Sequence, residues 1–217
     1  MKELNYAIFD MDGTLLDSMQ YWRTIVLDLA TRYGVEIDPK WREEAVYYSF
    51  RRAIAFLKEK TGNPALDRLN HPEMTLPIMD EHYKNDVAVR TGVRELLDAL
   101  QARGVRMCIV TATPTESTRA ALEHHGLDGY FEFILSPTEV PNGKKTPDAF
   151  YEVCRRFGGI DPRQCYLFED ALYSIKVAKP LGFYIVATED PLARNDKDEI
   201  LALCDEYYTD GFKIRVK

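Results

Sequence analysis

The sequence predicts an α/β protein with a doubly wound, Rossmann-like parallel sheet and an inserted small α-helical cap domain. Short apolar runs alternate with helical patterns along most of the chain, which is typical of a parallel sheet with helices on both faces. One long region breaks this alternation because it has helical periodicity without a convincing strand. We therefore expect an α/β core of residues 1–17 and 91–217 and a helical insert of residues 18–90.

The expected strands are apolar runs, each followed by acids or turn residues. They are Tyr6–Phe9, Arg106–Val110, Cys165–Phe168 and Tyr184–Ala187, with a weaker candidate at Phe131–Leu135. The core helices expected between them are Gly92–Ala102 and Ser117–His125, each closed by a glycine. In the insert we expect helices over Ser18–Tyr33, over Pro39–Lys60 with an interruption near Ser49, and near Pro72–Val87.

Composition narrows the functional classes. The 217 residues carry a formal net charge of −7, with lysine and arginine scattered along the chain, so nucleic acid is not an expected partner. The four cysteines, Cys108, Cys154, Cys165 and Cys204, have no metal-ligand spacing and indicate reduced thiols. No apolar run approaches the length of a membrane span and no cleaved signal is evident, so we expect a cytoplasmic protein.

Two carboxylates follow the first predicted strand. Asp10 and Asp12 are two residues apart on an extended chain, so their side chains point the same way. One ionised carboxylate can attack an electrophile while a protonated neighbour acts as a general acid. Gly13 and Thr14 follow, where the backbone can turn tightly and present N–H groups to an anion.

Other polar residues follow later strands. Thr111 supplies a short hydroxyl that can hold a phosphoryl oxygen. Lys144 supplies a positive charge just before a helix, for which Thr146 is the expected N-cap. Glu169 and Asp170 supply the hard oxygen ligands that Mg²⁺ prefers.

These four motifs, in this order, resemble the haloacid dehalogenase superfamily of phosphohydrolases. The corresponding segments are Asp10–Ser18, Thr111, Gly143–Phe150 and Glu169-Asp170, and the resemblance spans Tyr6 to Gly182. The helical insert is similar to the small cap of the branch that contains phosphoglycolate phosphatase and β-phosphoglucomutase. The chain departs from the family pattern at Ala171, Ser174, Pro180 and Thr91.

The resemblance implies a role for each motif residue. Asp10 would be the nucleophile that forms an aspartyl-phosphate, and Asp12 the acid and base. Mg²⁺ would be held by Asp10, the backbone carbonyl of Asp12 and Asp170, with Glu169 nearby. Thr111 and Lys144 would bind the transferring phosphoryl group.

Several assignments remain open in the sequence. Lys145 competes with Lys144, although the motif favours Lys144, and Thr113 is a loop residue beside Thr111 that could help to bind. The insert offers candidates for reading the rest of the substrate, namely Tyr21, Trp22, Arg51 and Arg52. Adjacent helical positions point about 100° apart, so we expect only one of the two arginines to face the site.

The expected function is a Mg²⁺-dependent phosphatase acting on a small phosphorylated metabolite, as a monomer or dimer. A phosphosugar mutase is the first rival, although that branch typically carries histidine where this chain has Trp22. A signalling module phosphorylated on aspartate is the rival from another class, but it needs no inserted domain. A calcium-binding loop is excluded because Gly13 is fourth in the loop rather than sixth.

Overall fold

The computed structural model describes residues 4–45, 47–48, 50–69, 71–190, 194–209 and 211–212. The chain divides into two compact units: residues 1–17 with 88–217, and Ser18–Val87. Within the described residues no helix combines the length and apolar character needed to cross a membrane.

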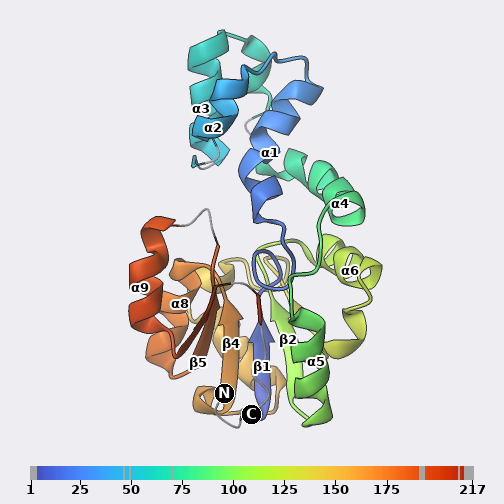
Figure 1. Ribbon diagram of the computed structural model, residues 1–217, viewed down its shortest axis with the longest axis vertical. Helices are drawn as coiled ribbons and strands as arrows, with labels where there is room; N and C mark the ends of the chain where they lie inside the picture. Colours follow the sequence, from blue (N-terminus) through green and yellow to red (C-terminus); the bar gives the residue numbers. More distant parts are fainter. Residues whose placement is uncertain are drawn as a thin grey trace. The chain divides into compact units, whose positions relative to one another are not determined.

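The first unit is built on a six-stranded parallel sheet with the order β3-β2-β1-β4-β5-β6 (Figure 1). Its strands are β1 (Tyr6–Phe9), β2 (Arg106–Val110), β3 (Ile134–Leu135), β4 (Cys165–Glu169), β5 (Tyr184–Thr188) and β6 (Glu206–Tyr208). The chain runs outward from β1 to β3 and then returns to the other side of β1 at β4. The predicted doubly wound sheet is confirmed, and its topological switch point lies between β1 and β4.

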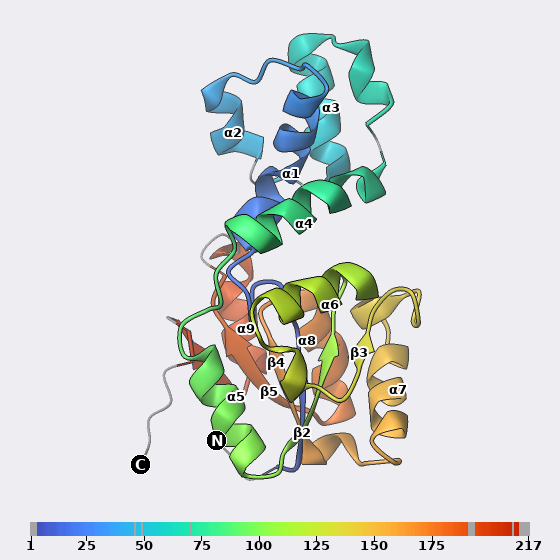
Figure 2. The same cartoon turned by 90° about the vertical axis from the view of Figure 1, so that its right-hand side faces the viewer.

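Helices cover both faces of this sheet. They are α5 (Val93–Ala102), α6 (Thr115–His124), α7 (Asp148–Arg156), α8 (Leu172–Ala178) and α9 (Lys197–Leu203). One face packs against α7, α8 and α9 through a buried cluster that includes Ile8, Leu167 and Phe150. Figure 2 shows α5 on the opposite side of the sheet from α7. On that other face, the rings of Phe9 and Phe168 stack with centres 4.3 Å apart.

The sequence missed β6, and its prediction of the third strand was too long. Residues of β6 are only half-buried on the edge of the sheet, so Glu206–Tyr208 lacks the continuous apolar run that marks the central strands. The expected strand at Phe131–Leu135 shortens to Ile134–Leu135. The N–H of Glu132 still donates to the carbonyl of Met107, and the carbonyl of Phe133 accepts from the N–H of Ile109.

The described residues of the second unit form helices and 3₁₀ turns, with no strand among them. It contains α1 (Met19–Arg32), α2 (Pro39–Ala45), α3 (Phe50–Thr61) and α4 (Leu76–Asn85), with 3₁₀ turns at Pro64–Asp67 and Pro72–Thr75. Helix α1 contacts each of the other three helices. The predicted interruption of the second helix is confirmed between Ala45 and Phe50, although Ser49 itself lies outside the described residues. Pro77 is tolerated because it lies in the first turn of α4.

The two connections to the helical unit run side by side within the first unit. Leu16 and Val89 form an antiparallel bridge. The N–H of Asp17 donates to the carbonyl of Ala88, and the N–H of Arg90 donates to the carbonyl of Leu15, both at 2.9 Å. The chain therefore leaves and re-enters the sheet unit directly beside the loop that follows β1.

Two neighbouring aromatic residues of α7 provide a test of the sheet packing. Phe150 is fully buried, whereas Tyr151 is 55% exposed. We expect Phe150→Ala to lower the free energy of unfolding by about 3–5 kcal/mol, because it leaves a cavity under the sheet. The matched control Tyr151→Ala should stay within about 0.5 kcal/mol of the unsubstituted protein. Denaturant unfolding measures both, and equal effects would contradict the packing described.

Candidate functional site

A cluster of three buried carboxylates lies at the carboxyl ends of β1 and β4. Asp10 directly follows β1, Glu169 is the last residue of β4, and Asp170 follows it. Each of the three offers a carboxylate oxygen within 4.8 Å of the others, and their exposed fractions are 5%, 0% and 5%. The adjacency of β1 and β4 at the switch point brings these distant parts of the sequence together.

Lys144 pairs with two of these acids. Its Nζ atom lies 2.8 Å from Oδ2 of Asp10 and 2.9 Å from Oε2 of Glu169. The side chain is buried, whereas the neighbouring Lys145 is exposed. Of the two lysines left open by the sequence, the structure therefore brings Lys144 into the acidic cluster.

The prediction of Thr146 as a helix N-cap was wrong. A 3₁₀ turn occupies Gly143–Lys145, α7 begins at Asp148, and Pro147 takes the N-cap position. The hydroxyl of Thr146 instead donates to Oδ2 of Asp148 at 2.9 Å.

Burial and like charges dominate the electrostatics of this cluster. Burial raises the pKa of Asp10 well above its usual range; Glu169 raises it further, and Lys144 opposes the change. Burial, again with Glu169, raises the pKa of Asp170 to about 7. Burial disfavours the charged form of Lys144, but Asp10 and Glu169 outweigh it and hold the pKa of Lys144 well above its usual range.

The cluster fits a divalent cation. Three buried carboxylates face one ammonium group, and buried charges require partners or a coordinated metal. Oxygen donors are the ligands that hard cations prefer. Thr14 also donates its hydroxyl to Oδ1 of Asp170 at 3.2 Å, and the N–H of Ala171 donates to Oε1 of Glu169 at 3.0 Å, so both carboxylates are held in place.

Asp12 lies outside this carboxylate cluster and is held by a residue that the sequence left open. The hydroxyl of Thr113 donates to Oδ2 of Asp12 at 2.7 Å. Thr111 is buried after β2, and its hydroxyl accepts from the N–H of Thr113 at 3.1 Å. The two threonines thus form one turn, in which Thr113 orients the carboxylate expected to act as acid and base.

Arg90 was not predicted from the sequence. Gly13 adopts φ 81°, a left-handed conformation that suits glycine, and its N–H donates to the carbonyl of Leu16 at 2.9 Å. Arg90 donates from Nη1 to the carbonyl of Gly13 and from Nη2 to the carbonyl of Glu189, the latter at 2.9 Å. No spacing in the sequence signals this contact, since the partners come from three separate segments.

The four predicted substrate-reading residues belong to the helical unit. Tyr21 donates its hydroxyl to the carbonyl of Asp86 at 3.1 Å, and Trp22 donates from Nε1 to the hydroxyl of Tyr83 at 3.3 Å. The Arg52 guanidinium lies 5.1 Å from the ring centre of Tyr48, and both Arg51 and Arg52 are exposed. The described contacts of these side chains lie within their own unit, so their role with a substrate stays a prediction.

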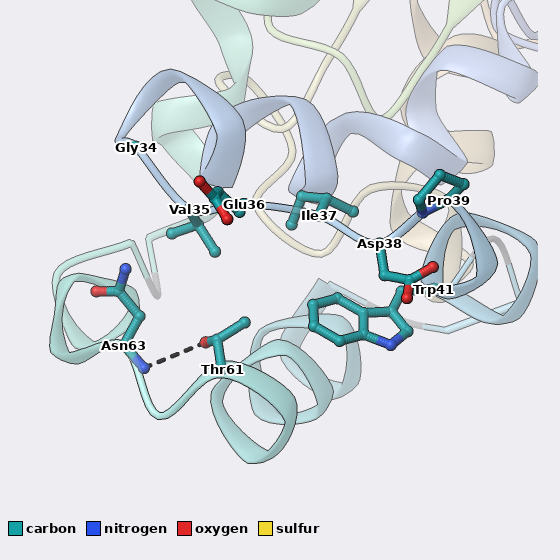
Figure 3. Close-up of a pocket in the computed structure, with 9 residues that line it drawn as sticks. All are labelled: Gly34, Val35, Glu36, Ile37, Asp38, Pro39, Trp41, Thr61 and Asn63. Atoms are coloured by element: carbon teal, nitrogen blue, oxygen red, sulfur yellow. Dashed lines mark hydrogen bonds between the residues drawn. The ribbon is translucent and has the colours of Figure 1, made fainter.

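A separate open hollow of about 690 Å³ lies within the helical unit. It is lined by the segment between α1 and α2 and by the residues at the end of α3, as Figure 3 shows. Trp41, Asp38 and Thr61 border it, and Thr61 accepts a hydrogen bond from the N–H of Asn63 at 3.1 Å. None of the predicted site residues lines this hollow.

Comparison with known proteins identifies the class of the protein. The family model of haloacid dehalogenase-like hydrolases matches residues 7–188, which include Asp10, Thr111, Lys144 and Glu169-Asp170. The chain belongs to this family. The predicted superfamily is confirmed, and with it the enzyme class of a phosphoric monoester hydrolase.

Individual relatives are phosphatases by name. The chain is 28% identical to (DL)-glycerol-3-phosphatase 1, mitochondrial, of Arabidopsis thaliana, over 92% of this chain and 70% of that protein. It is also 28% identical to the fructose-1-phosphate phosphatase YqaB of Escherichia coli (strain K12), over 81% of this chain and 91% of the relative. The fold is similar to that of a predicted phosphoglycolate phosphatase from Haemophilus somnus 129PT, with a TM-score of 0.76, 21% identity and coverage of 97% and 96% of the two chains.

The excess of negative charge in the cluster predicts that the carboxylate of Asp170 destabilises the folded protein when no metal is bound. Because the pKa of Asp170 is about 7 in the folded protein, against 3.8 ordinarily, the folded protein binds more protons than the unfolded chain between these pH values. The contribution of Asp170 to the free energy of unfolding therefore falls as the pH rises through that window. We expect Asp170→Asn to stabilise the protein in EDTA at pH 8 by on the order of 2 kcal/mol, and by much less at pH 4.

Thermal unfolding in EDTA at both pH values measures this difference. Asp98→Asn, at an exposed position on α5, is the matched control and should show no such pH-dependent gain. Destabilisation by Asp170→Asn at pH 8 would contradict the electrostatic description.

Proposed function

We propose that this protein is a Mg²⁺-dependent phosphatase that hydrolyses a small phosphorylated metabolite, of the sugar or polyol phosphate class, through an aspartyl-phosphate on Asp10. The observation that carries the proposal is the contact of Lys144 with Asp10, at 2.8 Å, inside a buried carboxylate cluster. A cation fixed beside a buried nucleophile suits the transfer of an anionic phosphoryl group. The names of the relatives, which include glycerol-3-phosphate and fructose-1-phosphate phosphatases, support the substrate class.

In the first step, a carboxylate oxygen of Asp10 attacks phosphorus and the bond from phosphorus to the ester oxygen breaks. Asp12 donates its proton to that oxygen, which leaves as an alcohol. Lys144 and the hydroxyl of Thr111 bind oxygens of the phosphoryl group during the transfer. The hydrogen bond from Thr113 to Asp12 keeps the acid in one orientation.

In the second step, water attacks the phosphorus of the aspartyl-phosphate. Asp12, now ionised, accepts the proton of that water, and the bond between phosphorus and Asp10 breaks. Inorganic phosphate leaves, Asp10 is restored as a carboxylate, and Asp12 carries a proton again. Asp12 therefore switches from acid to base between the two steps, while Asp10 carries the phosphoryl group, and the cycle restores both residues.

Mg²⁺ would be held by side-chain oxygens of Asp10 and Asp170, by the Asp12 carbonyl, and by Glu169 nearby. When bound, it supplies positive charge that offsets the repulsion between the carboxylates and a phosphate dianion. The helical unit, inserted after β1, would serve as the cap that excludes water and selects the substrate.

Substitution of the nucleophile tests the chemistry. We expect Asp10→Asn to lower kcat by on the order of 10³-fold or more, because an amide cannot form the phosphoenzyme. Release of inorganic phosphate from a panel of phosphorylated metabolites measures it, with Asp98→Asn as the matched control. An Asp10→Asn protein with unchanged turnover would refute the mechanism, and an isomerised phosphate ester without phosphate release would indicate a mutase.

Removal of divalent cations tests the metal. We expect EDTA to abolish hydrolysis and added Mg²⁺ to restore it. Mg²⁺ should also raise the melting temperature of the metal-free protein, by mass action on the folded state, and Asp170→Asn should weaken that shift. Hydrolysis that continues unchanged in EDTA would exclude the metal from the proposal.

A further inference from the structure

Tyr173 is an exposed aromatic side chain next to the buried ionic cluster. Its ring centre lies 6.0 Å from Nζ of Lys144. Lys144 is 3% exposed and Asp10 is 5% exposed, whereas Tyr173 is 41% exposed. Tyr173 is therefore a solvent-exposed ring close to the buried lysine that is proposed to bind the phosphoryl group.

Local structure fixes this position. Tyr173 is the second residue of α8, which starts directly after Glu169-Asp170 and Ala171. Helix α8 contacts the turn Gly143–Lys145 that carries Lys144. Because the helix is anchored both to the acids and to the lysine turn, the ring is held beside the cluster rather than on a free loop.

The geometry limits what the ring can touch. A phosphoryl oxygen bound to Lys144 lies about 2.8 Å from Nζ, and apolar atoms are in contact at about 4 Å. The organic part of a phosphate ester must extend from the buried cluster toward solvent, so its first carbon atoms fall within reach of the Tyr173 ring.

The chemistry of tyrosine suits a carbohydrate. The ring offers a flat apolar face, and the hydroxyl offers a polar end. Burial raises the pKa of Tyr173 to about 12, and Glu169 contributes to the rise against the effect of Lys144, so the hydroxyl remains a donor near neutral pH. A sugar or polyol has both C–H faces and hydroxyl groups for these partners.

We propose that Tyr173 is a specificity-determining residue whose ring packs against the sugar or polyol group of the substrate while the phosphoryl group occupies the Lys144 site. This inference rests on the proposed phosphatase function and adds the part of the site that reads the leaving group. From the sequence, residues that read the rest of the substrate were expected only in the helical insert. Tyr173 adds such a residue in the sheet unit.

A purely structural role makes a different prediction. If Tyr173 only shielded the pair between Lys144 and Asp10 from water, its loss would weaken the hydrolysis of every substrate equally. If it contacts the leaving group, the loss depends on the size of that group. Acetyl phosphate, with its compact acyl group, and a hexose or polyol phosphate therefore separate the two roles.

The experiment compares kcat/KM of the unsubstituted enzyme, Tyr173→Leu and Tyr173→Phe in Mg²⁺, with Tyr151→Leu as the matched exposed tyrosine control. We expect Tyr173→Leu to lose about 10-fold on a hexose or polyol phosphate and less than about 2-fold on acetyl phosphate. Tyr173→Phe keeps the ring and should stay within about 3-fold of the unsubstituted enzyme on both. Tyr151→Leu should change neither value.

Equal losses on acetyl phosphate and on the sugar phosphate would overturn the inference in favour of shielding. Two results for the variants would also overturn it: no loss of kcat/KM in Tyr173→Leu on either substrate, or a loss in Tyr173→Phe as large as in Tyr173→Leu. So would an unsubstituted enzyme that hydrolyses acetyl phosphate but no sugar or polyol phosphate. An unsubstituted enzyme inactive on every phosphate would refute the proposed function itself, so the two failures are distinct.

Discussion

The site depends on one buried ammonium group that faces three buried carboxylates. Lys144 contacts Asp10 and Glu169 at 2.8 and 2.9 Å, and Asp170 completes the cluster. Buried charges are costly unless they are paired, and removing one partner from such a pair is strongly destabilising. The lysine therefore offsets part of the cost of burying Asp10, whose pKa is still held above its usual range by burial and Glu169. The excess of carboxylates over ammonium groups makes the cluster a natural place for a divalent cation.

The surrounding polar contacts hold this cluster and its neighbours in place. Thr113 orients Asp12, and Thr14 donates to Asp170. Arg90 joins the carbonyls of Gly13 and Glu189, next to the paired connections that lead to the helical unit. A displacement of those connections would act directly on the loop that carries Asp10 and Asp12, the proposed nucleophile and the proposed acid and base.

Much of this could be predicted from the sequence, for identifiable reasons. The central strands were recognisable because a parallel strand buried on both faces needs an unbroken apolar run, as Cys165–Phe168 shows. The edge strand Glu206–Tyr208 was missed because it is only half-buried and needs no such run. Thr146 was misassigned because a 3₁₀ turn occupies Gly143–Lys145 and α7 begins only at Asp148, so that Pro147 takes the N-cap position.

The sequence alone determined the family, the parallel sheet and the positions of the motif residues, because residue type and spacing are local properties. Only the tertiary structure decided which lysine is buried against Asp10 and that the hydroxyl of Thr113 donates to Asp12. It also decided that Arg90 and Tyr173 lie beside the motifs. These contacts join residues far apart in the chain, and the order of strands at the switch point, not their spacing in sequence, brings them together.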